Sequence, residues 1–382
     1  MSDLVGDRVR FSLYFSLVCG AAISLGLWMT ETPLSEDPIL YFDRVEAVVE
    51  GGWPYVNTDL EHLPMSFALM VITWFLGGSA GIETFTIVFA VLMGISLFVS
   101  ARLVSSIGLE LGISDSHWTF LLIAGPLLPL VVFRNDPISL MFTAFALLAF
   151  VRHQPGRGGV WTGVAIAAKG WPVILALVAW WRGRRLLAVS LIAWTVGLVA
   201  LLLWSPGFRA GRSFNGIHME TFAGSLVGLV RSLRGDPLGL IEAAGARYID
   251  VSSVIVFIQA GLGVGIGLVF AWRTMRNPPN WNLVPHLLAG TTLALLLASP
   301  LLSAQFLLWP LLFVALISER AVHWVALALS SLTIVYVALW TGLFNWPALW
   351  FSIIVIRNAL MLLLIAGLAV GPASLKAQLA SE

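Results

Sequence analysis

Long apolar segments alternate with short polar segments along the whole chain. A helix needs about 20 apolar residues to cross the hydrocarbon core of a bilayer, and runs near that length recur throughout the sequence. They begin near Phe11, Met65, Thr84, Trp118, Pro137, Val160, Leu186, Ser253, Val284, Leu301, Trp324 and Ala348. The pattern predicts an all-α membrane protein, a helical bundle with about 12 transmembrane helices and a range of about 10 to 13.

Basic residues indicate which ends of these helices face the cytoplasm. By the positive-inside rule, Arg8 with Arg10, Arg182 with Arg184 and Arg185, and Arg273 with Arg276 should lie on that side. Residues 30–64 and 205–250 then form two extracytoplasmic loops. The first apolar run is not followed by a convincing signal-peptidase pattern, so we expect it to be retained as a membrane span.

One segment does not fit simple alternation of the helices. Alternation places Arg152 and Arg157 outside, whereas the charge rule places them in the cytoplasm. The apolar run from Trp161 to Trp181 is interrupted by Lys169 and Gly170. A broken or re-entrant helix at this interruption would reverse the local topology and remove the conflict.

Composition supports the membrane class and excludes several others. Of the 382 residues, 59% are hydrophobic and 11% are charged, which is too few charges for a water-exposed surface. The net charge of +1 provides no field for nucleic acid. The single cysteine, Cys19, lies in the first apolar run, which excludes a disulfide framework and a thiolate metal site.

The first loop is rich in carboxylates and contains the signals of a short helix. Asp37 and Pro38 form a good N-cap and first-position pair, and Gly51 is a good stop signal. An amphipathic helix along the membrane surface is predicted, because four apolar residues share one helical face. These are Ile39, Phe42, Val45 and Val49.

Asp37 has two interpretations on the sequence alone. It can cap this helix, or it can accept a proton from a sugar hydroxyl as that hydroxyl attacks an anomeric carbon. The two roles are compatible. Asp43 and Asp59 are the competing carboxylates of the same loop.

Charges within or beside the apolar runs are the other candidates for chemistry. Lys169 would cost about 2.5 to 3.5 kcal/mol to insert, so it needs a partner, either a substrate phosphate or a carboxylate. Arg134 and Asp136 lie at a span junction, where they can pair with each other or form a wall of a site. In the second loop, His218 and Glu220 can bind a phosphate or a sugar, but their spacing does not indicate zinc.

A resemblance becomes visible when these fragments are taken in order. Asp37 and Tyr41, the turn Gly52–Tyr55, and Glu61–Pro64 at a span entrance are similar to the first loop of the polyprenol-phosphate-mannose-dependent mannosyltransferases of glycosyltransferase family 87, in the GT-C superfamily. Lys169 with Pro172, the segment Asn215–Thr221 and the segment Ser303–Trp309 match later motifs of that family, with several substitutions.

The resemblance implies a fold, a reaction and a site. The chain, residues 1–382, would be one GT-C-like transmembrane domain that moves a hexose, mannose above all, with inversion and without a cofactor. Its substrates would be a polyprenyl-phosphate sugar donor and a glycolipid or glycan acceptor. Asp37 would be the general base; Lys169, His218 and Arg134 would bind the donor phosphate; Tyr41, Tyr55, Glu61, His62, Glu220 and Gln305 would bind the sugar or the acceptor.

A transporter or flippase of a lipid-linked sugar is the alternative from another class. Broken helices and intramembrane charges also mark transport sites, but a transporter concentrates its charges at the membrane midplane. The carboxylate-rich first loop favours the enzyme. We expect a multi-pass protein of the bacterial cytoplasmic membrane, with its active site on the extracytoplasmic side.

Overall fold

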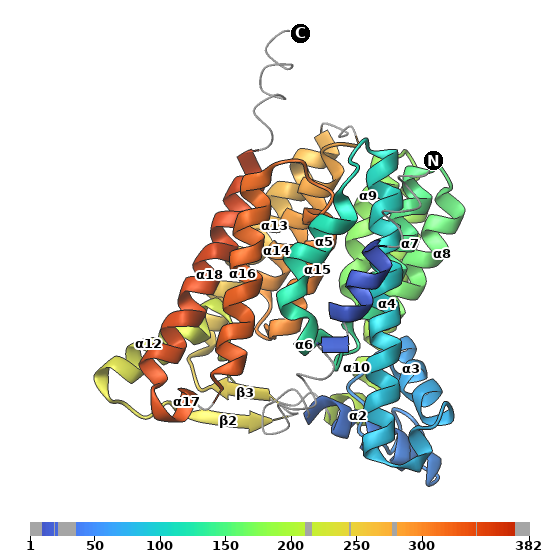
Figure 1. Ribbon diagram of the computed structural model, residues 1–382. Helices are drawn as coiled ribbons and strands as arrows, with labels where there is room; N and C mark the ends of the chain where they lie inside the picture. The colour runs from blue at the N-terminus through green and yellow to red at the C-terminus, as the bar shows by residue number, and fades with distance from the viewer. Residues whose placement is uncertain are drawn as a thin grey trace.

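A computed structural model shows a helical bundle with a small sheet at one end (Figure 1). It describes residues 10–18, 20–21, 36–210, 216–243, 246–276, 281–340 and 342–370. Arg8, Cys19 and two stretches of the predicted loops, residues 30–35 and 211–215, lie outside this description. The architecture agrees with the predicted all-α membrane class.

Five helices of the described part are long and apolar enough to cross a membrane. The apolar window of α13 is only 17% buried inside the protein, so most of its apolar side chains face outward, as expected for contact with lipid. The other apolar segments are shorter, and the predicted count of about 12 spans is not confirmed. The five are α4 (Ile82–Glu110), α10 (Arg185–Trp204), α13 (Ser253–Arg276), α16 (Arg320–Ala338) and α18 (Pro347–Val370).

Three pairs of shorter helices turn back on themselves inside the bundle. Non-helical backbone is tolerated at such turns where it is buried in protein or lines a cavity. The first pair joins α5 (Ser116–Ala124), η2 (Gly125–Leu127) and α6 (Leu128–Val131) to α7 (Asp136–Val151). The second pair is α8 (Pro155–Ala168) with η3 (Trp171–Ile174) and α9 (Leu175–Trp181). The third pair is α14 (Val284–Ala298) with η4 (Ala304–Leu307) and α15 (Leu308–Val314).

The three turns meet one another, and we call them the interior tips: residues 132–135, 169–170 and 299–303. The rings of Trp171 and Trp309, which follow the second and third tips, stack with centroids 5.3 Å apart. Trp309 Nε1 donates to Asp136 Oδ1 over 2.6 Å, which joins the third pair of helices to the first. Segments far apart in sequence therefore present their polar turn residues at one place.

The opposite ends of these helices carry Arg152 and Arg182. Arg152 Nε bonds to Glu110 Oε1 over 2.8 Å, and Arg182 contacts His153, so the turns after α4, α7 and α9 lie together. α8 leads from this end to the tip at Lys169, where the helix ends, and α9 leads back. The interruption predicted in this run is present, and it returns Arg152 and Arg182 to the same end of the bundle.

The first loop packs through α2 (Glu36–Val49) against the lower half of α4 in the view of Figure 1, and the helix that follows the loop, α3 (Pro64–Phe75), packs there too. Tyr41 and Val45 of α2 are buried in a cluster with Phe85 of α4. Aromatic side chains provide much of this contact, so the loop is a packed part of the fold rather than a loose connection.

The helix in the first loop differs in detail from the prediction. It begins at Glu36, so Asp37 lies inside its first turn, and Gly51 follows its end with a positive φ of 108° that favours glycine. Of the four residues on the predicted apolar face, Val45 is fully buried, whereas Ile39 and Val49 are 47% and 55% exposed. The buried face is rotated toward Tyr41, because aromatic packing against α4 fixes the helix.

The second loop forms a three-stranded antiparallel sheet in the order β1-β3-β2 and one amphipathic helix. Thr221 caps that helix by accepting from Gly224 N, and Gly235 ends it in the left-handed conformation. The elements are α11 (Pro206–Ala210), β1 (Ile217–His218), α12 (Phe222–Arg234), β2 (Leu240–Ala243) and β3 (Ala246–Ile249); α17 (Gly342–Asn345) packs beside α18.

Candidate active site

A cavity of about 600 Å³ lies where α2, the interior tips and the small sheet come together. This volume is within the range of pockets that bind small molecules. Nine of the ten residues that the sequence nominated line it: Asp37, Tyr41, Glu61, His62, Arg134, Lys169, His218, Glu220 and Gln305.

Asp37 is anchored through one of its two carboxylate oxygens. Oδ2 accepts a 3.0 Å hydrogen bond from the Tyr41 hydroxyl one turn later and forms an ion pair with Arg134 Nη1. Burial, together with the charges of Asp136 and Glu61, raises the pKa of Tyr41 well above its usual value, so the phenol remains a donor. The Asp37 side chain is 22% exposed and lines the cavity, so an incoming hydroxyl can reach it.

The first interior tip provides three polar side chains with separate partners. Arg134 forms an ion pair with Asp37, and its neighbour Asp136 binds Lys169 and Trp309. Asp136 is fully buried; its Oδ2 lies 3.1 Å from Lys169 Nζ. Tertiary contacts between tips therefore decide the pairing.

Lys169 ends α8 in an extended conformation and directs its ammonium group to the cavity wall. Nζ donates to Asn135 Oδ1 over 3.0 Å and to Asp136, and lies 5.0 Å from the ring centroid of Phe306. The side chain is 22% exposed. The sequence left two possible partners for Lys169, a carboxylate or a substrate phosphate. The structure is compatible with both, because Lys169 has a carboxylate partner and also reaches the cavity.

Glu61 and His62 form a second polar group beside α2. Glu61 binds Arg44 Nε at 3.2 Å and His62 Nε2 at 3.3 Å, and His62 Nδ1 lies 3.3 Å from the side-chain amide of Asn135. Burial raises the pKa of Glu61, but the hydrogen bond and charge of His62 and the charge of Arg44 outweigh it and lower the pKa to about 2. Glu61 is therefore a stable carboxylate.

His218 and Glu220 come to the opposite wall of the cavity from β1 and the turn before α12. His218 N donates to Pro300 O over 2.9 Å, which ties β1 to the third interior tip. Burial lowers the pKa of His218 despite the charge of Glu220 and a hydrogen bond to Leu302, so the imidazole is neutral at pH 7. His218 therefore carries no charge; its one N–H is directed at the Leu302 carbonyl, and Nδ1 lies 3.4 Å from Glu220 N.

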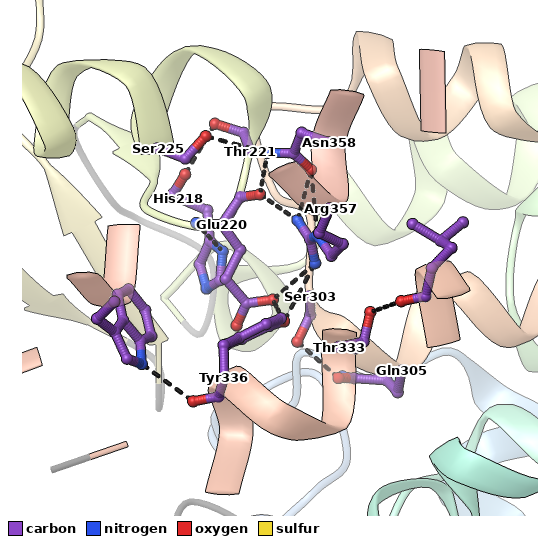
Figure 2. A network of polar contacts seen from close by, with 12 residues as sticks. His218, Glu220, Thr221, Ser225, Ser303, Gln305, Thr333, Tyr336, Arg357 and Asn358 are labelled. Carbon is purple, nitrogen blue, oxygen red and sulfur yellow. Dashed lines mark hydrogen bonds and ion pairs between the residues drawn. The ribbon is translucent and has the colours of Figure 1, made fainter. Parts of the chain in front are cut away.

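Glu220 is held by two side chains that sequence reasoning missed (Figure 2). Oε2 accepts a hydrogen bond from the Tyr336 hydroxyl of α16 and lies 3.6 Å from Arg357 Nη1 of α18. The available signal was Arg357 itself, a charge inside the apolar run that begins near Ala348.

Gln305 reaches the cavity from η4, beside the third interior tip. Its Oε1 accepts from Ser303 Oγ over 2.6 Å, which orients the amide. On the same side of the cavity, Arg247 of β3 stacks over Trp340 at 4.7 Å and binds Glu242 at 3.2 Å. Arg247 and Trp340 also line the cavity and had no sequence signal.

Three other candidates of the first loop lie away from the cavity. Asp43 and Asp59, the competitors of Asp37, are exposed and do not line it. Tyr55 does not line it either; its hydroxyl donates to His62 O over 2.7 Å, and its own carbonyl accepts from Gly207 N at 3.2 Å. Tyr55 thus joins the first loop to α11 and binds the main chain of His62 from outside the cavity.

The cavity combines several carboxylates, three cationic side chains and a neutral imidazole with an apolar side. That side includes Val199 and Leu203 of α10, whose outer surfaces remain 43% and 54% exposed. A ligand with a polar head and an apolar tail fits such a distribution. The arrangement can bind a phosphate, remove a proton and admit a lipid chain.

Comparison with known proteins identifies a family. The sequence profile of glycosyltransferase family 87 matches residues 62–300, more than half of the chain. The match begins after Asp37 and ends before Gln305, so it covers the tips that carry Arg134 and Lys169 but not the whole cavity. No curated protein matches the chain. The chain belongs to glycosyltransferase family 87 and is a membrane glycosyltransferase.

Proposed function

We propose that the protein transfers a hexose, specifically mannose, from a polyprenyl-phosphate carrier to a hydroxyl of a glycolipid or glycan, with inversion at the anomeric carbon. One observation carries the proposal. Asp37 lies in the same cavity as Arg134 and Lys169, so a carboxylate able to take a proton adjoins cations able to hold a phosphate.

The reaction needs one base and a place for one leaving group. The acceptor oxygen attacks the anomeric carbon from the face opposite the phosphate, and the bond from that carbon to the phosphate oxygen breaks. Asp37 Oδ1 receives the hydroxyl proton, while the polyprenyl phosphate leaves with the electron pair. Arg134 and Lys169 offset its negative charge. His218, the third candidate for the phosphate, would exchange its hydrogen bond to the Leu302 carbonyl for one to the phosphate.

The pair between Arg134 and Asp37 gives the base a means of activation. An opposite charge close to a carboxylate favours its ionised form and makes it a weaker base. When the donor phosphate engages Arg134, it draws positive charge away from Asp37, and the carboxylate becomes a stronger base. Proton removal would then be coupled to the presence of donor.

A lipid-linked donor is favoured by the apolar side of the cavity. Val199 and Leu203 border the cavity on α10, a helix with few buried residues that is long enough to span a membrane. An isoprenoid chain can lie along such a surface while its phosphate remains at the cationic groups. A water-soluble nucleotide sugar would gain nothing from this wall.

The remaining polar groups can recognise sugar hydroxyls. Glu61, His62, Glu220 and Gln305 line the cavity with Tyr41, and carboxylate and amide oxygens accept hydrogen bonds from hydroxyl groups. Arg152 and Arg182 lie at the end of the bundle away from the cavity, and the positive-inside rule then favours an extracytoplasmic cavity in a bacterial cytoplasmic membrane.

The test is sugar transfer by the purified protein in lipid nanodiscs, with radiolabelled mannosyl phosphoryl polyprenol and a panel of glycolipid acceptors. Loss of a general base costs about 10²- to 10⁴-fold, so Asp37→Asn should lose activity to that extent. Asp43→Asn removes a nearby exposed carboxylate and should keep full activity.

Two results would contradict the proposal. Full transfer by a folded Asp37→Asn protein would exclude Asp37 as the base. Absence of transfer from every polyprenyl donor, combined with movement of a lipid-linked sugar across vesicle membranes, would favour the flippase instead.

A further inference from the structure

The inner face of α18 carries a cation that the proposed reaction does not use. Arg357 is fully buried, although it lies in a helix apolar and long enough to span a membrane. An arginine at the centre of such a helix is costly to insert into a membrane, so its presence there points to a role in a site.

The partners of Arg357 converge on a single residue of the second loop, Glu220 (Figure 2). Arg357 Nη2 donates to the main-chain oxygen of Glu220, and Asn358 Nδ2 donates to the same oxygen over 3.2 Å. Arg357 Nη1 donates to the Tyr336 hydroxyl over 3.1 Å, and that hydroxyl donates to Glu220 Oε2. Both the backbone and the carboxylate of Glu220 are thereby fixed from the last two long helices.

This arrangement leaves one carboxylate oxygen of Glu220 uncommitted. Within the described part of the chain, no residue donates a hydrogen bond to Oε1, and Glu220 lines the cavity. A carboxylate anchored through one oxygen presents the other at a defined position. Asp37, on the other wall, is anchored in the same way by Tyr41 and Arg134.

We propose that Arg357 and Tyr336 are positioning residues: they orient Glu220 so that its free oxygen accepts a hydrogen bond from a sugar hydroxyl of the substrate. The inference rests on the proposed function, because it assumes that a sugar occupies this cavity. It assigns a role in substrate recognition to two residues of α16 and α18, both outside the segment that matches the family.

A simple structural tie between α18 and the second loop is the competing explanation. Such a tie would make Arg357 and Tyr336 matter for stability only. The positioning role predicts in addition that the effect of losing the Tyr336 hydroxyl on substrate affinity depends on the presence of the Glu220 carboxylate.

The kinetic experiment is a double-mutant cycle with Tyr336→Phe, Glu220→Gln and the double variant. The Tyr336→Phe protein keeps the aromatic packing and should raise KM for the sugar substrate by about tenfold with a smaller change in kcat, the scale of one charge-assisted hydrogen bond. In the Glu220→Gln background the same change should have less than about a twofold effect. Thr333→Val is the matched control, since its buried hydroxyl bonds only to Leu329 O of its own helix, at 2.7 Å.

A second readout does not depend on activity. Asn358→Ala removes one donor to the Glu220 carbonyl, so hydrogen–deuterium exchange should accelerate in a peptide covering residues 217–222, and Thr333→Val should leave that peptide unchanged. Unchanged exchange in Asn358→Ala would contradict the anchoring of the backbone.

The outcomes separate the two hypotheses. If the increases in KM caused by Tyr336→Phe and by Glu220→Gln multiply in the double variant, the two residues act independently. That result would overturn the positioning role, even in an active enzyme. A wild-type protein without sugar transfer would contradict the proposed function and the sugar contact of Glu220, and the exchange experiment would still decide whether α18 anchors the loop.

Discussion

Trp309 donates its indole N–H to Asp136, a residue 173 positions earlier in the chain, over 2.6 Å. The other carboxylate oxygen of Asp136 binds Lys169 at 3.1 Å. One fully buried carboxylate therefore joins all three pairs of interior helices. Because the same contact holds the ammonium group proposed to bind phosphate, stability and function are linked at this point.

Substitution of Lys169 should separate these two contributions. Lys169→Ala leaves Asp136 buried without its counter-charge, so the free energy of unfolding should fall by about 3 to 5 kcal/mol, the usual cost of breaking a buried pair. The double variant Lys169→Ala/Asp136→Asn should recover much of that stability. If Lys169 binds the donor phosphate, the double variant should still show a raised KM for the donor.

Thermal inactivation and initial rates over a range of donor concentrations measure the two effects. A double variant that recovers both stability and donor affinity would show that Lys169 has only a structural role.

Arg134 should affect the rate more than the fold. Arg134→Gln removes a cation from the position proposed for the leaving phosphate, and loss of one such group typically lowers kcat by about 10²- to 10³-fold. Arg134→Lys keeps the charge but not the planar guanidinium, so its kcat should lie between those of the wild type and Arg134→Gln. Arg152→Gln, which breaks an exposed ion pair at the other end of the bundle, is the control and should leave kcat unchanged.

The Arg134 prediction is checked by single-turnover rates at saturating donor. A normal rate in Arg134→Gln would remove this guanidinium from the proposed mechanism.

Glu61 should make stability depend on acid pH. Its pKa falls from the ordinary 4.5 to about 2 in the folded protein, so the carboxylate stabilises the fold above pH 4.5. That contribution is lost as the pH falls from 4.5 toward 2, because the unfolded chain takes up the proton first. The difference in melting temperature between wild type and Glu61→Gln should therefore shrink over this interval.

Detergent-solubilised protein followed by intrinsic fluorescence between pH 7 and pH 3 provides the measurement. A difference that stays constant down to pH 3 would contradict the assignment of the lowered pKa to Glu61.

Substitution by alanine should affect the stability of the protein differently at two glycines, Gly197 within α10 and Gly207 just after it. A Cβ at Gly207 would overlap the carbonyl oxygen of Thr58, whereas a Cβ at Gly197 meets no atom within 4 Å. Gly207→Ala should separate the first loop from α11 and lower both stability and activity. Gly197→Ala lies within the helix and should be neutral or stabilise it by up to about 1 kcal/mol.

Melting temperatures of the two variants in the same detergent provide the comparison. Equal stability of both would show that the first loop does not depend on the close approach at Gly207.

The sequence predicted the class of the fold and the interrupted helix at Lys169 because both follow from local composition. A charge and a glycine inside an apolar run are visible without knowledge of the fold. The length of the spans was less predictable. Apolar runs such as the one beginning near Met65 look sufficient for a span, but α3 has only 12 residues and packs beside α4.

Most candidate site residues could be found from motif order, whereas their partners could not. Nothing near Arg134 in the sequence indicates a pair with Asp37, since the contact arises from packing of α2 against the interior tips. Arg357 was visible as a charge in an apolar run, but its link to Glu220 spans 137 positions. Such pairings depend on tertiary structure, which periodicity does not encode.

The interior tips also suggest how this enzyme could change substrates over evolution. Asp136, directly after the first tip, binds Lys169 of the second tip and Trp309 beyond the third, so an insertion in one tip would displace the others, and we expect these tips to tolerate little variation in length. The walls of the cavity come from the first loop and the small sheet, and side-chain contacts such as those of Asp37 with Arg134 and of His62 with Asn135, which a substitution can change without altering chain length, connect the first loop to the tips. Novel acceptor preferences should therefore arise by remodelling those walls while the machinery for the donor is inherited intact.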